Sequence, residues 1–285
     1  MEENQEETKD FNWGKVEWGK RIAGGAYGIV FLCQYGGKKV AIKVICAGEE
    51  DIDGVETAEL SFLREVSTCS LLDHPNIAKF ITAKEDVNPP LKDLKNSGFC
   101  GVIVSEYLEG GTLASYVRHH KKLALKEKIK LALEVARGLY YLHSKNIAHR
   151  DVKLDNLLLD GQGRVKIIDF GVSRIETEDM SVKVGTKGYI APEVLVSNSY
   201  NHRCDVFSFG ICLWELYYLK RFGSSLASST PQIGKDCPKK LADLMRRCWT
   251  DPSTRPEMAE VVKTLEDVLK KAERSPFGCF SFLKR

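Results

Sequence analysis

The first third of the chain has the short apolar runs of β-strands, punctuated by glycine and polar residues. "GIVFLCQY" (28–35) and "KKVAIKVIC" (38–46) are rich in β-branched and aromatic residues, and Gly36–Gly37 between them predicts a turn. "IAKFITA" (77–83) and "FCGVIVSEY" (99–107) have the same character. The pattern therefore predicts a strand-rich region that ends near residue 107.

Helical spacing first replaces the strand pattern between Val55 and Leu72. Apolar positions there predict one buried face, made by Leu60, Leu63, Val66, Ser70 and Leu71. Further on, "KEKIKLALEVARGLYYLHS" (126–144) carries a continuous amphipathic stripe of Ile129, Leu133, Ala136, Leu139 and Tyr140. Three more helices are predicted at 205–219, 238–249 and 256–271. Gly110–Gly111 marks the change from strands to helices, which predicts two lobes joined by a hinge.

Composition adds bounds to this picture. With 43% hydrophobic and 28% charged residues the chain is ordinary for a soluble protein, and a net charge of +3 is too small to imply a nucleic-acid partner. The first ten residues carry five acids and one lysine, so we expect a disordered acidic tail over residues 1–14. The nine cysteines form no CxxC pair and no zinc-like cluster with histidine, so buried reduced thiols are expected.

No N-terminal stretch has the apolar segment of a signal peptide. The most apolar helical stretch, "GICLWELYYL", is short and contains Glu215, so it is expected to be a buried helix and not a membrane span. These features predict a cytoplasmic protein, with the nucleus as the alternative address.

Candidate chemistry begins with "IAHRDVKLDNLLLD" (147–160), where polar and charged residues stand between two apolar runs. Buried charges are costly unless they are paired or bind a ligand. Asp151 and Asn156 on this stretch, and Asp169 in "VKIIDFG", supply the oxygen ligands that Mg²⁺ prefers. We therefore expect Asn156 and Asp169 to hold Mg²⁺ and Asp151 to face a substrate hydroxyl. The alternative is a satisfied polar network with no chemistry.

Two further features suit a bound phosphate. In "IAGGAYGIV" (22–30), Gly25 and Gly28 would let backbone N–H groups approach anionic oxygens, although a plain turn is the alternative. A strand pattern follows, which argues against a dinucleotide-binding loop, since that loop opens a helix. Lys43 lies in an apolar run and needs an anion, either phosphate or a carboxylate on the next helix: Glu56, Glu59 or Glu65.

In this order the motifs match the signature set of protein kinases: "AGGAYGIV", "VAIK", "HRDVKLDN", "DFG", "GTKGYIAPE", "DVFSFG" and "CWTDPSTRP". From Gly19 to Leu269 the chain resembles the protein kinase family. "FLREVSTCSLLDHPNI", "EYLEGGTL" and "CDVFSFGICLWEL" are similar to the plant Raf-like kinases, MAP kinase kinase kinases of the tyrosine-kinase-like group. The resemblance implies an α+β bilobal fold, with a small β-rich N-lobe with one main helix (15–106), a larger mostly helical C-lobe (107–275) and a tail (276–285).

The resemblance also implies ATP and Mg²⁺ as cofactors and assigns roles. Lys43 would hold the α- and β-phosphates and pair with Glu65, which lies ten residues before Pro75; Glu59 is the second choice. Asp151 would be the catalytic base, and Lys153 would steady the transferred phosphate. Ser105 would be the gatekeeper, Glu106 and Leu108 would offer backbone groups to adenine, and the remaining nucleotide contacts would be Ala23, Gly25, Gly28, Val30, Ala41 and Leu158.

Lys153, two residues after Asp151, implies transfer to Ser or Thr hydroxyls of protein substrates, with dual specificity as an alternative. Arg150 would pair with a phosphate on the loop between Asp169 and Glu193. Thr177 and Ser181 are the phosphosite candidates, modified by an upstream kinase or by autophosphorylation, and Thr186 is expected on the substrate side. Glu193 and Arg255 are expected to form a structural ion pair.

Two features depart from the family. Ala23 stands where kinases usually have the first glycine of the loop, and the helix-G region near 220–237 looks shortened. That deletion leaves a pseudokinase, a scaffold that binds nucleotide or partners without turnover, as the alternative function. The intact set of Lys43, Asp151, Asn156 and Asp169 favours an active enzyme. The tail "FGCFSFLKR" includes Cys279, a conceivable acylation site, but we expect no stable membrane contact.

Overall fold

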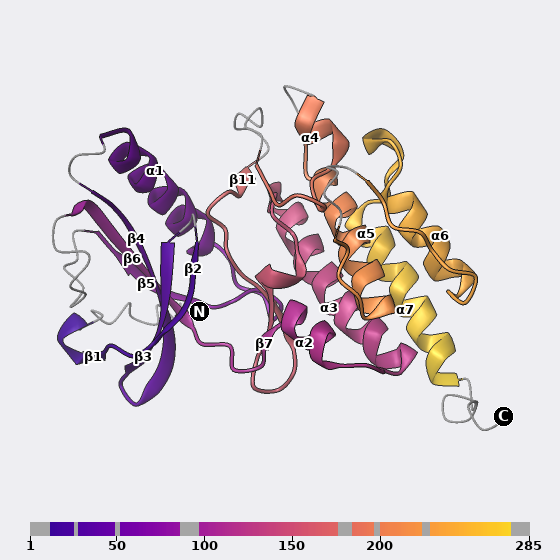
Figure 1. Cartoon of the computed structure of the whole chain (residues 1–285), viewed down its shortest axis with the longest axis horizontal. Helices are drawn as coiled ribbons and strands as arrows, with labels where there is room; N and C mark the ends of the chain where they lie inside the picture. Colours follow the sequence, from indigo (N-terminus) through magenta and orange to yellow (C-terminus); the bar gives the residue numbers. More distant parts are fainter. Residues whose placement is uncertain are drawn as a thin grey trace, which may run out of the picture. The chain divides into compact units, whose positions relative to one another are not determined.

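The computed structural model describes residues 12–25, 28–48, 52–85, 97–175, 184–196, 200–223 and 229–274. Its contacts divide the chain into two compact units. The first unit comprises Met1–Leu72 and Lys79–Tyr107, and the second comprises Asp73–Ala78 and Leu108–Arg285. The first unit is mainly a β-sheet and the second is mainly helical (Figure 1), so the predicted α+β fold with a strand-rich first part and a helical second part is confirmed.

The first unit is built on one antiparallel six-stranded sheet. Its strands are β1 (Val16–Glu17), β2 (Arg21–Gly25), β3 (Gly28–Tyr35), β4 (Lys38–Gly48), β5 (Phe80–Lys84) and β6 (Ser97–Glu106). They are ordered β1-β3-β4-β6-β5, and β2 pairs with β3. A 3₁₀ turn (Trp13–Lys15) precedes them, so ordered structure reaches into the last residues of the predicted tail; residues 1–11 lie outside the described part.

Helix α1 (Ile52–Cys69) lies against β4 and β6, as Figure 1 shows. Its buried side matches the predicted one only in part: Leu60 and Leu63 are 41% and 44% exposed, whereas Phe62 is 2% exposed. Phe62 packs edge-on against Phe99 on the sheet, and Val55, Ala58 and Val66 line the same cluster. Of the predicted face, Val66 does line this cluster, whereas the leucines do not, because one large aromatic ring sets the rotation of the helix.

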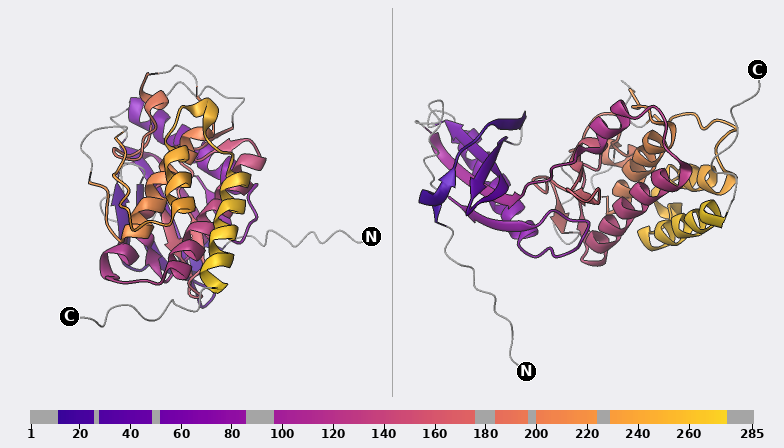
Figure 2. Two further views of the ribbon diagram at one scale, coloured as in Figure 1. Left: turned by 90° about the vertical axis from the view of Figure 1, so that its right-hand side faces the viewer. Right: turned by 90° about the horizontal axis from the view of Figure 1, so that it is seen from below.

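The second unit holds the remaining helices, which Figure 2 shows from two further sides. They are α2 (Leu113–His119), α3 (Leu125–Ser144), α4 (Pro192–Val196), α5 (Arg203–Tyr218), α6 (Lys239–Cys248) and α7 (Met258–Arg274). Helix α3 packs along α7 and α5, and α5 also contacts α6. Tyr140, expected in the buried stripe of α3, is 48% exposed, because Leu139 and Leu142 fill the interior instead.

Short strands flank the polar loop of the second unit, residues 149–156. They are β7 (Gly111–Thr112), β8 (Ile147–Ala148), β9 (Leu157–Leu159), β10 (Val165–Ile167) and β11 (Arg174–Ile175), with 3₁₀ turns at Leu154–Asn156 and Pro252–Thr254. Strand β9 lies between β10 and β7, and β11 pairs with β8. The loop between β8 and β9 is therefore fixed at both ends.

Helix α5 is buried on nearly all sides, as expected for "GICLWELYYL". Within the described part of 219–238 no helix occurs, and the chain instead lies against the end of α5. The Trp214 indole N–H donates to the Gln232 carbonyl at 2.9 Å, and the Gly234 N–H donates to the Tyr218 hydroxyl at 2.6 Å. Among the described residues, none of the helices combines the length and apolarity needed to cross a membrane.

The cysteines depart in one place from the expected reduced thiols. Cys46 on β4 and Cys100 on β6 lie opposite each other in the register, with Cα atoms 4.3 Å apart, and are linked as a disulfide. The expectation is wrong for this pair because strand pairing places the two side chains together. Six other described cysteines are free, and five of them are buried.

Candidate active site

Lys43 and Glu65 meet within the first unit. Lys43 lies on β4, and its Nζ donates to Glu65 Oε2 at 2.6 Å. Both side chains are largely shielded from water, with 14% and 6% exposed. Glu59, the second choice, is exposed on α1. The apolar run around Lys43 thus buries an ammonium group that a helix carboxylate partly compensates.

The predicted nucleotide contacts of the first unit lie on its sheet. Ala23 and Gly25 are on β2, paired with Val30 and Gly28 of β3, and Ala41 on β4 pairs with Ser105 on β6. Gly28 has φ of +117°, and a Cβ there would approach the Val44 carbonyl oxygen to 2.5 Å. A glycine is therefore required at this position. The loop tip at residues 26–27 lies outside the described part.

Glu106 ends β6, and its backbone N–H donates to the Lys79 carbonyl at 3.0 Å, while its carboxylate accepts from the Lys79 N–H at 2.7 Å. Leu108 and Leu158 belong to the second unit, where Leu108 is buried and Leu158 is half-buried on β9. The predicted nucleotide contacts are thus divided between the two units. Their roles remain predictions.

Asp151 is the centre of a polar cluster in the second unit. Its Oδ2 accepts from Lys153 Nζ at 2.6 Å and from Asn156 Nδ2 at 3.0 Å. Its Oδ1 accepts from the Thr186 hydroxyl at 2.7 Å, and Lys153 Nζ donates to that hydroxyl at 2.8 Å. Asp151 is 3% exposed. A buried carboxylate therefore contacts both a cation and an alcohol, the groups that a phosphate transfer to a hydroxyl needs.

Asn156 and Asp169 are brought together by the β9–β10 hairpin. The Ile168 N–H donates to the Asn156 carbonyl at 3.0 Å, which fixes Asp169 next to the polar loop. Asp169 has φ of +67°, an uncommon backbone conformation for a residue other than glycine. The amide and carboxylate oxygens of this pair fit a hard cation that also binds substrate phosphates. Among the described residues, no larger group of His, Cys, Asp or Glu could hold a metal.

Asp205, on helix α5, fixes the start of the polar loop. It is fully buried on α5, and its carboxylate accepts from the backbone N–H groups of His149 and Arg150, each at 2.8 Å, and contacts His143 Nε2 at 3.0 Å. Burial alone would raise the pKa of Asp205, but hydrogen bonds and positive charge from the histidines lower it. Asp205 received no role from the sequence analysis. Its position in the apolar run "DVFSFG" could have indicated a buried acid with hydrogen-bond partners.

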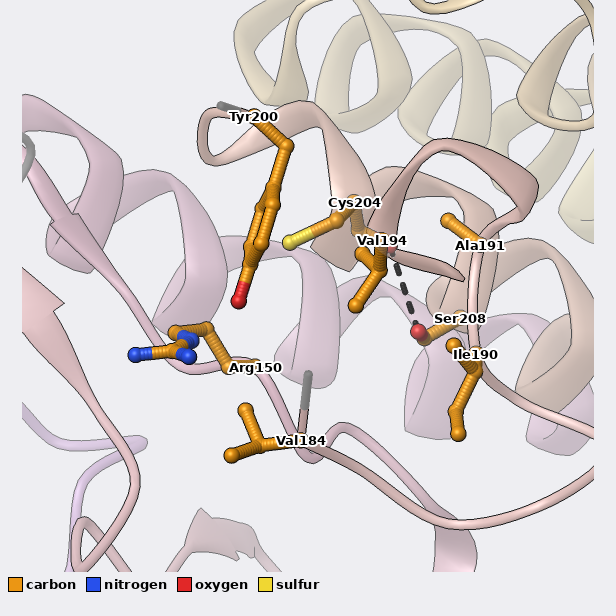
Figure 3. A pocket seen from close by; sticks show the side chains of 8 residues that line it. All are labelled: Arg150, Val184, Ile190, Ala191, Val194, Tyr200, Cys204 and Ser208. Carbon is orange, nitrogen blue, oxygen red and sulfur yellow. Dashed lines mark hydrogen bonds between the residues drawn. The ribbon is translucent and has the colours of Figure 1, made fainter. Parts of the chain in front are cut away.

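Arg150 lines a small pocket with Tyr200 and Cys204 (Figure 3). Its guanidinium lies 5.4 Å from the centre of the Tyr200 ring, a cation–π contact, and φ at Arg150 is +71°. Figure 3 also shows Ser208, which lines the same pocket and donates a hydrogen bond from its hydroxyl to the Cys204 carbonyl at 3.2 Å. The phosphosite candidates Thr177 and Ser181 lie outside the described residues.

The predicted ion pair of Glu193 and Arg255 is confirmed. Arg255 binds both carboxylate oxygens of Glu193, at 2.5 and 2.8 Å, with 1% of its side chain exposed. The same guanidinium donates to the Arg203 carbonyl at 3.0 Å. This bidentate pair fastens the segment after Thr186 to α5 and to the turn before α7.

Comparison with known proteins identifies the family. Residues 16–265 match the protein kinase domain. The serine/threonine/tyrosine-protein kinase HT1 of Arabidopsis thaliana is 34% identical over 280 residues, covering 93% of this chain and 68% of that protein. The Arabidopsis serine/threonine-protein kinases STY17 and STY46 are each 34% identical, and the chain spans 45% and 46% of their lengths. The chain therefore belongs to the protein kinase domain family, as its motifs predicted, among serine/threonine protein kinases.

Proposed function

We propose that this chain is an active ATP-dependent serine/threonine protein kinase, which transfers the γ-phosphate of ATP to hydroxyl groups of protein substrates in intracellular signalling. The observation that carries this proposal is the cluster around Asp151. A buried carboxylate there already accepts a hydrogen bond from an alcohol, the Thr186 hydroxyl, at 2.7 Å, with an ammonium group beside both. Dual specificity, which the printed name of HT1 gives to that protein, is a finer alternative.

Asp151 would accept or orient the proton of the attacking hydroxyl, a contribution on the order of 10²–10⁴-fold in rate. Lys153, which binds Asp151 at 2.6 Å, would offset negative charge on the group in transit. Phosphoryl transfer has a loose transition state with charge on the peripheral oxygens, so the protein acts mainly by positioning and electrostatics. The Asn156 amide, bonded to Asp151, couples the proposed metal ligand to the base.

ATP bound with Mg²⁺ would supply the transferable phosphate. Lys43, held by Glu65, would bind the α- and β-phosphates, and Asn156 and Asp169 would bind the cation. Val30, Ala41 and Leu158 would contact the adenine ring, and the backbones of Glu106 and Leu108 would bind its edge, with Ser105 as gatekeeper. Ala23, Gly25 and Gly28 would cover the phosphates.

Arg150 would bind a phosphate on Thr177 or Ser181, added by an upstream kinase or by the chain itself, and so order the loop before Thr186. Such a phosphate carries roughly two negative charges near pH 7. Transfer from ATP to intracellular proteins fits the cytoplasm or the nucleus. Protein substrates, and neither nucleic acid nor a membrane surface, are the proposed partners.

The test is phosphate transfer from radiolabelled ATP to a generic protein substrate. Wild type is compared with Lys43→Met, Asp151→Asn and the control Lys38→Met, an exposed lysine on the same strand. We expect label transfer by wild type and the control and its loss in the other two variants. Equal label from all four would refute the proposal. Thermal stabilisation by Mg-ATP without any transfer would instead identify a pseudokinase.

A further inference from the structure

Glu215 is a buried acid that the proposed transfer does not use. It lies on α5 with 0% of its side chain exposed. The Tyr189 hydroxyl donates to its Oε2 at 2.8 Å, the Phe222 N–H donates to Oε1 at 2.7 Å, and Arg221 Nε lies 3.2 Å from Oε1. Three donors thus surround the carboxylate and offset the cost of its burial.

Arg221 extends from this carboxylate to the polar loop. One of its terminal nitrogens donates to Asp155 Oδ2 at 2.7 Å and to the Tyr189 hydroxyl at 3.0 Å. Asp155 lies between Lys153 and Asn156 in the sequence, and Tyr189 is joined to Thr186 by a turn with an N–H···O distance of 3.0 Å. One guanidinium therefore links α5 to both segments that meet at Asp151.

A tight reversal of the chain places Arg221 in this position. Leu219 ends α5 with φ of +52°, and the Lys220 N–H donates back to the Glu215 carbonyl at 3.3 Å. The next residues then return over the helix, and Phe222 contacts Trp214 with ring centres 6.0 Å apart. The segment with the shortened helix-G region thus begins with an anchored arginine.

The two arms of Arg221 differ in environment. The arm to Glu215 is buried, whereas Arg221 and Asp155 are 35% and 47% exposed. An ion pair in contact with water contributes little to folding stability, because water and salt screen it. The arm to Asp155 can therefore orient the loop without being needed to keep the domain folded. A planar fork suits this task, since a lysine ammonium cannot direct donors to several fixed acceptors in one plane.

We infer that Arg221 is a positioning residue, which holds Asp155 and Tyr189 and thereby sets the approach of Asp151, Lys153 and Thr186. The catalytic part of this inference rests on the proposed kinase function. Without the guanidinium, Asp155 and the buried Glu215 would repel each other across the space it leaves. The polar loop would then relax away from α5, and small displacements of reacting groups lower rates strongly.

The kinetic test compares Asp155→Ala and Arg221→Ala with Asp243→Ala, which removes a matched exposed pair with Arg246 at 2.9 Å. We expect kcat of Asp155→Ala to fall roughly 10-fold to 100-fold at unchanged KM for ATP, with a melting temperature within about 2 °C of wild type. The kcat of Arg221→Ala should fall further, and guanidinium ion at millimolar concentration should restore part of it. Arg221→Lys should be intermediate. Wild-type kcat in Asp155→Ala, or a loss that follows the folded fraction alone, would overturn the inference.

A second measurement separates this inference from the proposed kinase function. Hydrogen exchange of the amides of Asn156 and Tyr189, whose acceptors are the carbonyls of Lys153 and Thr186, needs no catalysis. We expect both amides to exchange faster in Arg221→Ala and to be unchanged in Asp243→Ala. Unchanged protection would overturn the inference even in an active enzyme. Faster exchange in a protein that transfers no phosphate would leave the linkage standing and remove only the kinase function.

Discussion

Gly101 on β6 allows helix α1 to approach the sheet closely, because glycine has no Cβ atom to collide with Phe62. A Cβ at this position would lie 2.5 Å from Phe62 Cδ2 and 2.8 Å from its Cγ, so the ring would have to move. Because Phe62 fills the core between helix and sheet, Gly101→Ala is expected to lower the free energy of unfolding by about 1–3 kcal/mol. Urea unfolding of the whole chain measures this loss.

Gly48→Ala is the matched control for this substitution. Gly48 ends β4, and a Cβ there would meet no atom within 4 Å. Its unfolding midpoint should equal or slightly exceed that of wild type, because alanine restricts the unfolded chain. If both variants unfold at the same midpoint, the close approach of Phe62 does not limit this position.

A charged residue inside an apolar run indicates a buried polar group. The sequence contains more such residues than the predicted site included. The run around Asp151 was assigned to catalysis, while Asp205 and Glu215 on α5 were given no role. In the structure these two acids hold backbone N–H groups, a tyrosine and an arginine. The pattern can show that an acid is buried with partners, but the partners come from distant segments that only the fold brings together.

At the scale of elements, strands and long helices were predictable and the rotation of a helix was not. The β-branched runs gave β3, β4, β5 and β6, and the periodic stretches gave α3, α5, α6 and α7 within a few residues. Helices α2 and α4 escaped prediction because they have only seven and five residues, too few to show a period. For α1, the leucine positions suggested a face that is largely exposed, whereas the buried side chains of this helix include Phe62 and Glu65.

The two faces of α1 give opposite expectations for neighbouring residues. Phe62→Ala removes a ring that is 2% exposed and should lower the free energy of unfolding by about 3–5 kcal/mol. Leu63→Ala removes a side chain that is 44% exposed and should change it by less than about 0.5 kcal/mol. Urea unfolding monitored by circular dichroism measures both. A larger loss for Leu63→Ala would mean that the face first expected from the sequence is the buried one.

At the scale of the whole molecule, the motifs predicted the family and the kinase fold because each one requires a particular backbone context. "DFG" follows the β9–β10 hairpin, and "VAIK" lies within β4. The two-unit division passes within the chain at residues 73–78, which belong to the second unit although strand β5 follows them. No local pattern could show this, because Asn76 joins the second unit through a side-chain bond to the distant Val165 carbonyl, at 2.9 Å.

Buried acids of opposite behaviour predict a peaked pH profile of stability. Burial raises the pKa of Glu134 and Glu215 above its ordinary value of 4.5, so the folded chain binds protons more readily there. Their stabilisation is complete below pH 4.5 and is lost as pH rises through the folded pKa. Asp160 and Asp205 behave oppositely: burial alone would raise each pKa, but hydrogen bonds lower it below 3.8. Their stabilisation is lost as pH falls below 3.8.

Urea midpoints measured across this range should therefore fall on both sides of the interval between 3.8 and 4.5. Two isosteric variants distinguish the decline in stability toward acid pH from the decline toward neutral pH. Glu134→Gln keeps an acceptor for the Val165 N–H, now at 2.6 Å, and should flatten the decline toward neutral pH. Asp160→Asn keeps the acceptor for the Gln162 and Arg164 N–H groups and should flatten the decline toward acid. A profile that neither variant changes would show that other groups control the response of the molecule to pH.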